Sequence, residues 1–276
     1  MSEPTVRRET GELDATPDSN RSLRRRVRLA ASVALLGVGY WTLVRPRMLH
    51  WGATPAEVER TLPGDELLPE PDGESTMAIT IDAPPEAVWP WLRQLGQDRG
   101  GFYSYEWAEN LVGLGIHNAD EIVPEYQDLS VGDTVWLGRA DRFPDTRLEV
   151  ASIAPERALV LRSPGERPWW IWSFVLEPVG GAETRLLVRS RISLPRNPVV
   201  RFASQSVLDP VTFVMTRGML LGIRSRVESS PHTAAEGSAD SRTAAEGSAD
   251  SRTAAEGSAD DSDTGRARSD RSGERA

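Results

Sequence analysis

The pattern of apolar and polar residues changes along the chain and divides it into zones. Residues 1–23 are polar and charged without a hydrophobic period, which predicts a disordered segment, because such a stretch has little apolar surface to bury. Residues 24–47 contain an uncharged, mostly apolar run between Arg28 and Arg45. Residues 229–276 repeat the unit "TAAEGSADSR", and this small, acidic composition predicts a solvated tail with no chemistry of its own.

The uncharged run, residues 29–44, predicts a membrane-anchoring helix. A full span takes about 20 apolar residues, but arginines at both ends can snorkel toward water and shorten that length. Tyr40 and Trp41 lie where an interfacial aromatic belt is expected. A cleaved signal peptide and a buried soluble helix are the alternatives. No A-x-A cleavage pattern follows the run, and it lacks the amphipathic pattern of a buried helix.

Arginine is denser before this run than after it. By the positive-inside rule we expect a single-pass membrane protein with a cytoplasmic N-terminus and an extracytoplasmic folded domain.

Residues 48–74 predict a juxtamembrane linker with one short helix. Thr54 and Glu57 have capping-box spacing around Pro55, which suits the first position of a helix. A proline-rich and acidic stretch follows before the next periodic segment.

Residues 75–228 have the periodicity of a folded domain. A strand at 77–81 and a helix ended by Gly96 are followed by a second helix at 103–111, whose apolar side carries Tyr103 and Trp107. A period of two then predicts a run of strands, with Gly180 and Gly181 marking a hairpin. The expected strands are 131–137, 147–153, 158–162, 170–176 and 184–194.

A long apolar helix beginning near Asp209 and Pro210 closes the domain. This order predicts an α+β fold in which a curved antiparallel sheet wraps around the C-terminal helix. Such an arrangement leaves a cavity between the helix and the sheet that suits apolar ligands.

Composition removes several classes of function. The 276-residue chain has no cysteine and no lysine and a net charge of −9, which excludes thiolate and Schiff-base chemistry. The body of the chain offers no basic face for nucleic acid. His117 is the one histidine inside the expected folded domain, so we expect no metal site and no cofactor.

Several motifs together resemble a known superfamily. "IDAPPEAVWPWL" resembles the first strand and helix of the START / polyketide-cyclase (SRPBCC) superfamily, and "RGGFYSYEWAENL", "IHNADEIVPE" and "VGDTV" are similar to a membrane-associated subfamily with no assigned activity. The resemblance covers residues 51–226. It implies a helix-grip fold. Relatives bind lipids, sterols, quinones or hormones, and a minority are cyclases or dehydratases.

The segment "GGFYSYEWAENLVGLGIHNADEI" and the strand "RPWWIWSF" supply the candidate site. Large aromatic rings on an inner face suit a flat or lipid-like ligand, so we favour a binding protein for an apolar molecule. An acid–base enzyme of the cyclase or dehydratase type is the alternative. The aromatic rings could instead be core, and Glu106 and Glu109 the wet side of a helix. The predicted ligand-binding residues are Tyr103, Glu106, Trp107, Asn110, His117, Trp136 and Trp172.

Overall fold

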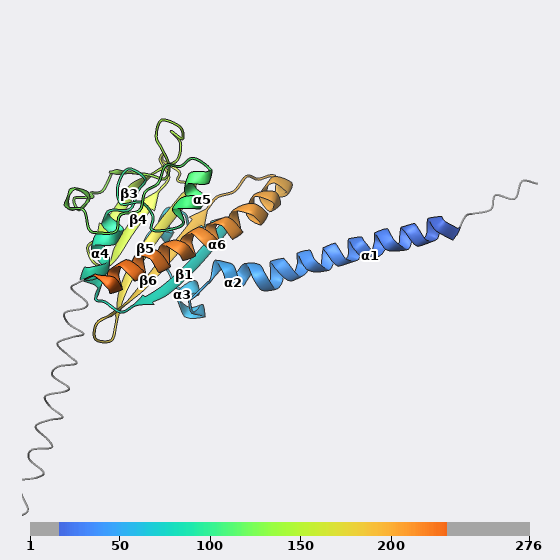
Figure 1. Cartoon of the computed structure of the whole chain (residues 1–276), viewed down its shortest axis with the longest axis horizontal. Coiled ribbons are helices and arrows are strands. Elements are labelled where there is room, and N and C mark those ends of the chain that lie inside the picture. Colours follow the sequence, from blue (N-terminus) through green and yellow to red (C-terminus); the bar gives the residue numbers. More distant parts are fainter. Residues whose placement is uncertain (1–16, 231–276) are drawn as a thin grey trace, which may run out of the picture. The chain divides into compact units, whose positions relative to one another are not determined.

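The computed structural model describes residues 17–230 (Figure 1), so the expectations for 1–16 and for the repeat tail from 231 onward lie outside the described residues. Its elements, in chain order, are α1 (Pro17–Gly39), the π-helical η1 (Tyr40–Val44), α2 (Arg45–Leu49), α3 (Pro55–Glu59), η2 (Asp65–Leu67), β1 (Gly73–Ile81), α4 (Pro85–Arg93), α5 (Glu106–Leu111), η3 (Pro124–Tyr126), β2 (Thr134–Trp136), β3 (Arg147–Ala154), β4 (Ala158–Arg162), β5 (Trp170–Val179), β6 (Glu183–Ile192) and α6 (Pro198–Ser229).

The strands form a six-stranded antiparallel sheet in the order β1-β6-β5-β4-β3-β2, which confirms the predicted α+β class. Gly180 and Gly181 both have positive φ, 48° and 57°, as a tight hairpin between β5 and β6 requires. Val188 lies opposite Met77 on one side and Phe174 on the other, so these side chains share one face of the sheet.

Helix α6 lies across this face of the sheet (Figure 1), which is the helix-grip arrangement. It begins at Pro198 and not near Asp209 as predicted. Pro210 lies inside the helix, which is long enough to absorb the loss of one backbone hydrogen bond. Asp209 does not cap a helix; its carboxylate pairs with Arg45, 2.6 Å away.

The predicted linker covers the opposite face of the sheet and is part of the domain. Leu62 packs in a buried cluster with Ala78, Val175 and Leu187. Arg189, which is 2% exposed, projects from this face of β6, and five polar groups satisfy it. It donates to Asp65 Oδ2 at 2.7 Å, to Thr76 Oγ1, and to the carbonyl oxygens of Glu57, Val58 and Arg60. This network fixes the linker to the sheet, because a buried guanidinium must be paired.

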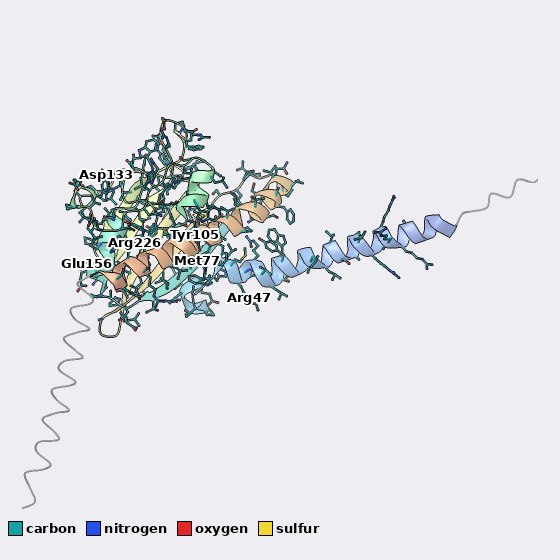
Figure 2. All side chains as sticks on the ribbon, in the orientation of Figure 1. Arg47, Met77, Tyr105, Asp133, Glu156 and Arg226 are labelled. Atoms are coloured by element: carbon teal, nitrogen blue, oxygen red, sulfur yellow. The ribbon has the colours of Figure 1, made fainter. Side chains whose placement is uncertain are left out.

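The N-terminal apolar helix runs through α1, η1 and α2. The stretch Leu23–Leu49 is long and apolar enough to cross a membrane, and its most apolar part is not buried. Figure 2 shows the side chains along most of this helix with no other part of the chain beside them. Residues 17–23, predicted to be disordered, continue this helix toward the N-terminus. Their polar composition does not predict a helix. A helix that has already formed in the neighbouring apolar segment can nevertheless extend into them, because propagation costs much less free energy than nucleation.

Helix α5 is shorter than predicted because Tyr103 cannot start it. Tyr103 has φ 58°, a left-handed conformation that no α-helix accommodates. The strand predicted over 131–137 is also shorter, since its regular pairing with β3 covers Thr134–Trp136.

Candidate ligand-binding site

A cavity of about 240 Å³ lies between α6 and the sheet face that carries Trp172. Its wall is mostly apolar, with aromatic rings from β5 on one side and methionines from α6 on the other. The lining residues are Phe102, Ser104, Glu109, Leu114, Ile116, Leu137, Trp170, Trp172, Ser190, Val211, Thr212, Met215, Thr216 and Met219.

The aromatic wall follows from the strand period of β5. Trp170 and Trp172 are two residues apart, so both side chains point to the same face, and their rings stack with centroids 5.6 Å apart. Phe102 approaches Trp172 from the loop before α5, at 6.0 Å. The indole N–H of Trp170 donates to Ser190 Oγ at 2.9 Å. The cavity therefore presents flat apolar surface to an occupant.

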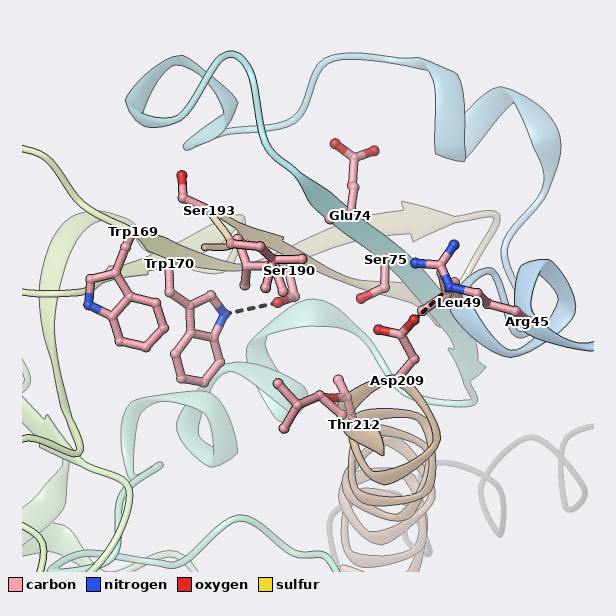
Figure 3. Close-up of a pocket in the computed structure, with 14 residues that line it drawn as sticks. Arg45, Leu49, Glu74, Ser75, Trp169, Trp170, Ser190, Ser193, Asp209 and Thr212 are labelled. Carbon is pink, nitrogen blue, oxygen red and sulfur yellow. Dashed lines mark hydrogen bonds and ion pairs between the residues drawn. The ribbon is translucent and has the colours of Figure 1, made fainter. Parts of the chain in front are cut away.

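A second hollow, of about 290 Å³, adjoins the first and shares Trp170, Ser190 and Thr212 with it (Figure 3). It lies at the end of the groove next to α2, where Arg45 and Asp209 form their ion pair. Typical small-molecule sites occupy roughly 300–1,000 Å³, so the two hollows together give the groove the size of a ligand site.

The first cavity, of about 240 Å³, is here called the inner cavity, and the second hollow is called the outer one. Glu109 is the one carboxylate among the described residues that line the inner cavity. Its side chain comes from α5 and is only 4% exposed, and Oε2 has no hydrogen-bond partner among the described residues. Burial, with a smaller contribution from the neighbouring Glu106 charge, raises the pKa of Glu109 to about 7. A buried polar atom without a partner is rare in folded proteins and is expected where a ligand supplies the missing hydrogen bond.

Hydrogen bonds fix the segment that leads into α5. Asn118 Oδ1 accepts from the backbone N–H groups of Phe102 and Tyr103 at 3.0 and 2.6 Å, and Ser104 Oγ donates to the carbonyl of Met215 at 3.0 Å. Gly222 of α6 lies so close that an added Cβ would come within 1.9 Å of the Tyr103 carbonyl oxygen. These contacts therefore fix the position of this segment, which forms part of the cavity wall.

One of the predicted site residues, Trp172, lines the cavity. Trp107 is 73% exposed and points away from the domain, because α5 turns Glu109 inward and its tryptophan outward. Tyr103 is buried against Trp91, whose carbonyl oxygen accepts its hydroxyl proton at 3.1 Å. Neither of these last two rings therefore lines the cavity.

The other predicted residues lie outside the cavity. Asn110 exchanges two hydrogen bonds with the backbone of Ile116, at 2.8 and 2.9 Å, and so positions a residue of the cavity wall. Glu106 accepts from the backbone N–H of Asn118. His117 is exposed, and Trp136 packs against the Arg147 guanidinium at 5.9 Å.

The predicted ligand-binding residues include none of those that α6 contributes to the cavity, and they do not include Glu109 of α5. Met215 and Met219 are four residues apart on the predicted C-terminal helix, a spacing that places both on one side. That spacing was a usable signal for the cavity wall. The sequence offers Glu109 as one of several possible acid–base side chains near His117, and a solvated helix side is the other interpretation of it.

Within residues 17–230, which the structure describes, no group of three or more histidine, aspartate or glutamate side chains is placed to hold a metal ion.

No family model matches the chain, and no curated protein is significantly similar to it in sequence. Solved structures do resemble it in fold. Protein Ms6760 from Mycobacterium smegmatis is 14% identical with a TM-score of 0.33, and the match covers 55% of this chain and 88% of that one. Protein CV1439 from Chromobacterium violaceum is 12% identical with a TM-score of 0.36, covering 57% and 99%. TTHA0849 from Thermus thermophilus is 18% identical with a TM-score of 0.31, covering 57% and 100%. Similarities this distant indicate no function.

Proposed function

We propose that the protein is a membrane-anchored binding protein for an apolar small molecule, held in the groove between α6 and the sheet. The observation that carries this proposal is the inner cavity, which is lined by aromatic and methionine side chains and contains one buried carboxyl group without a partner. Such a cavity gains affinity from desolvation and fixes orientation by a single polar contact.

The lining narrows the chemistry of the ligand. The stacked rings of Trp170 and Trp172 offer flat surface to a ring system or an extended chain. Met215 and Met219 can adapt to an irregular outline. Glu109 in its neutral form can donate to a carbonyl oxygen or accept from a hydroxyl group. A lipid, a quinone or a polyketide-like ring that carries one such oxygen fits these requirements.

The anchor in this proposal is the uncharged stretch 29–44 within the apolar helix Leu23–Leu49. Arginines lie at both of its ends and are denser on the N-terminal side, which supports a cytoplasmic N-terminus and an extracytoplasmic domain. Washing isolated membranes at high pH tests the anchor. Integral proteins stay in the pellet, and release of this chain into the supernatant would contradict it.

Glu109 also favours one alternative function. A carboxyl group with a pKa of about 7 in an apolar cavity is suited to general acid–base catalysis, as in a cyclase or dehydratase acting on a polyketide-like substrate. Binding remains the preferred function because no second titratable side chain lines the inner cavity beside Glu109. Conversion of a bound compound, lost in Glu109→Gln, would establish the enzyme.

Native mass spectrometry of the full chain, released from detergent micelles and followed by solvent extraction, tests the binding proposal. We expect a co-purified apolar molecule. Met215→Trp, which puts a larger side chain into the cavity, should displace the molecule. Trp107→Ala removes a 73% exposed ring outside the cavity and should leave the molecule bound. An empty wild-type protein whose melting temperature no lipid or quinone raises would refute the proposal.

A further inference from the structure

The amino-terminal half of α6 exposes an unusual amount of apolar surface. Seven of its large apolar side chains are at least 45% exposed, with Val199 at 74% and Val207 at 64%. Soluble proteins rarely leave so many large apolar side chains of one short segment in water. The exposed side chains, here called the α6 apolar face, are Val199, Val200, Phe202, Val207, Leu208, Val211 and Val214.

Both ionisable residues within 198–216 of this helix are neutralised by ion pairs. Arg201 pairs with Asp72 at 2.9 Å, and Asp209 pairs with Arg45 at 2.6 Å. The hydroxyl group of Ser206 donates to the carbonyl oxygen of Phe202, 2.7 Å away. Charged and polar groups need such partners in lipid, where no water can solvate them.

The α6 apolar face is continuous with the end of the anchor helix. Trp41 of η1 stacks on Phe202, with ring centroids 5.1 Å apart and an angle of 19° between the planes. Arg45, which ends the uncharged stretch, lies over the Trp41 ring at 4.7 Å and also holds Asp209. A tryptophan followed by an arginine is typical of the membrane–water boundary. The start of α6 therefore lies beside the point where the anchor helix leaves the bilayer.

We propose that the α6 apolar face lies in the interfacial layer of the same bilayer, so that the groove opens onto lipid. Leu208 belongs to this face and also lines the second hollow, the outer one. Figure 3 shows Arg45 and Asp209 in this hollow. The inference rests on the proposed anchor and deepens the proposed function: the ligand is a molecule dissolved in the bilayer, and it enters the groove at the end next to α2.

The absence of cysteine allows single nitroxide labels to be placed by substitution. The full chain in phosphatidylcholine–phosphatidylglycerol vesicles would carry one label at a time, and its accessibility to oxygen and to a water-soluble nickel chelate would be measured by spin-label relaxation. Val131→Cys is the matched control for Val207→Cys, because both valines are 64% exposed. Leu36→Cys reports on the anchor, and Leu208→Cys reports on the mouth of the groove.

We expect the labels at Val207 and Leu208 to be less accessible to the nickel chelate and more accessible to oxygen than the label at Val131. The label at Leu36 should show the same difference from the label at Val131. Nickel access at Val207 equal to that at Val131, with Leu36 protected, would overturn the inference and leave the anchor standing. Nickel access at Leu36 would overturn both. Spin–spin broadening at Val207 that vanishes on dilution with unlabelled protein would show that a second copy covers this face, and would overturn the inference as well.

Discussion

Replacing Glu109 with glutamine should make the stability of the protein, relative to wild type, increase as pH rises from 4.5 to 8. The carboxyl group has a pKa of about 7 in the folded protein against 4.5 as its ordinary value. Below pH 4.5 both states of the protein hold the proton, so the group contributes no pH dependence. Between pH 4.5 and 7 the unfolded chain releases a proton that the folded chain keeps. The stability of the wild type therefore falls as pH rises through this window.

The size of the effect follows from the two pKa values. A change of one in pKa corresponds to about 1.4 kcal/mol, so the rise in the pKa of Glu109 from 4.5 to about 7 sets an upper limit of about 3–4 kcal/mol on the effect above pH 7. Glutamine has the same shape and no charge. The difference in unfolding free energy between Glu109→Gln and wild type should increase between pH 4.5 and pH 8, by an amount up to this limit. For a domain of this size, each kcal/mol of unfolding free energy changes the melting temperature by about 2–4 °C.

Guanidinium unfolding of the full chain in detergent micelles, followed by tryptophan fluorescence at several pH values, measures this difference. Glu125→Gln, on the exposed surface, is the matched control and should track the wild type throughout. The buried amide of glutamine also lacks a partner, so the pH dependence of the difference is diagnostic and its absolute value is not. A difference that stays constant from pH 4.5 to 8 would mean that Glu109 titrates normally, and the reasoning from its burial would be wrong.

The remaining predictions concern the packing around the cavity and under the sheet. Gly222→Ala should lower the free energy of unfolding by at least about 1–3 kcal/mol, because the new methyl group would meet the Tyr103 carbonyl oxygen at 1.9 Å. Gly37→Ala, in a helix with nothing within 4 Å, should leave the melting temperature unlowered when both variants are compared with wild type by thermal unfolding. Asp65→Asn should cost about 3 kcal/mol or more, because the buried Arg189 guanidinium loses its nearest carboxylate, at 2.7 Å, and keeps only Glu74, at 3.9 Å. This expectation is wrong if Asp65→Asn unfolds at the same denaturant concentration as wild type.

The local pattern of the chain determined its elements and their order. Strand alternation in "RPWWIWSF" placed Trp170 and Trp172 on one face and Ile171 on the other, and the bulk on both sides indicated a strand covered on both faces. The structure buries Trp172 beneath α6 and Ile171 beneath the segment around Gly64. Period and turn chemistry act between neighbours in sequence, so they are visible without the fold.

Tertiary contacts decided which side chains form the site. Helix α5 has apolar and acidic residues on several sides, and the sequence favoured Trp107 as its buried residue. The left-handed Tyr103 and its close approach to Gly222 rotate the segment so that Glu109 enters the cavity and Trp107 faces outward. Which of the two side chains is buried depends on the contact between Tyr103 and Gly222, which lie more than a hundred residues apart in the sequence. No local pattern encodes such a contact.

The same reason explains the segment taken as a linker. Residues 48–74 look like a spacer because they are rich in proline and carboxylates, yet Asp65 is there to neutralise Arg189 on the sheet. The composition of each partner was plain in the sequence. Their pairing was not, because a charge is stable inside a protein only through the partner that the fold brings to it.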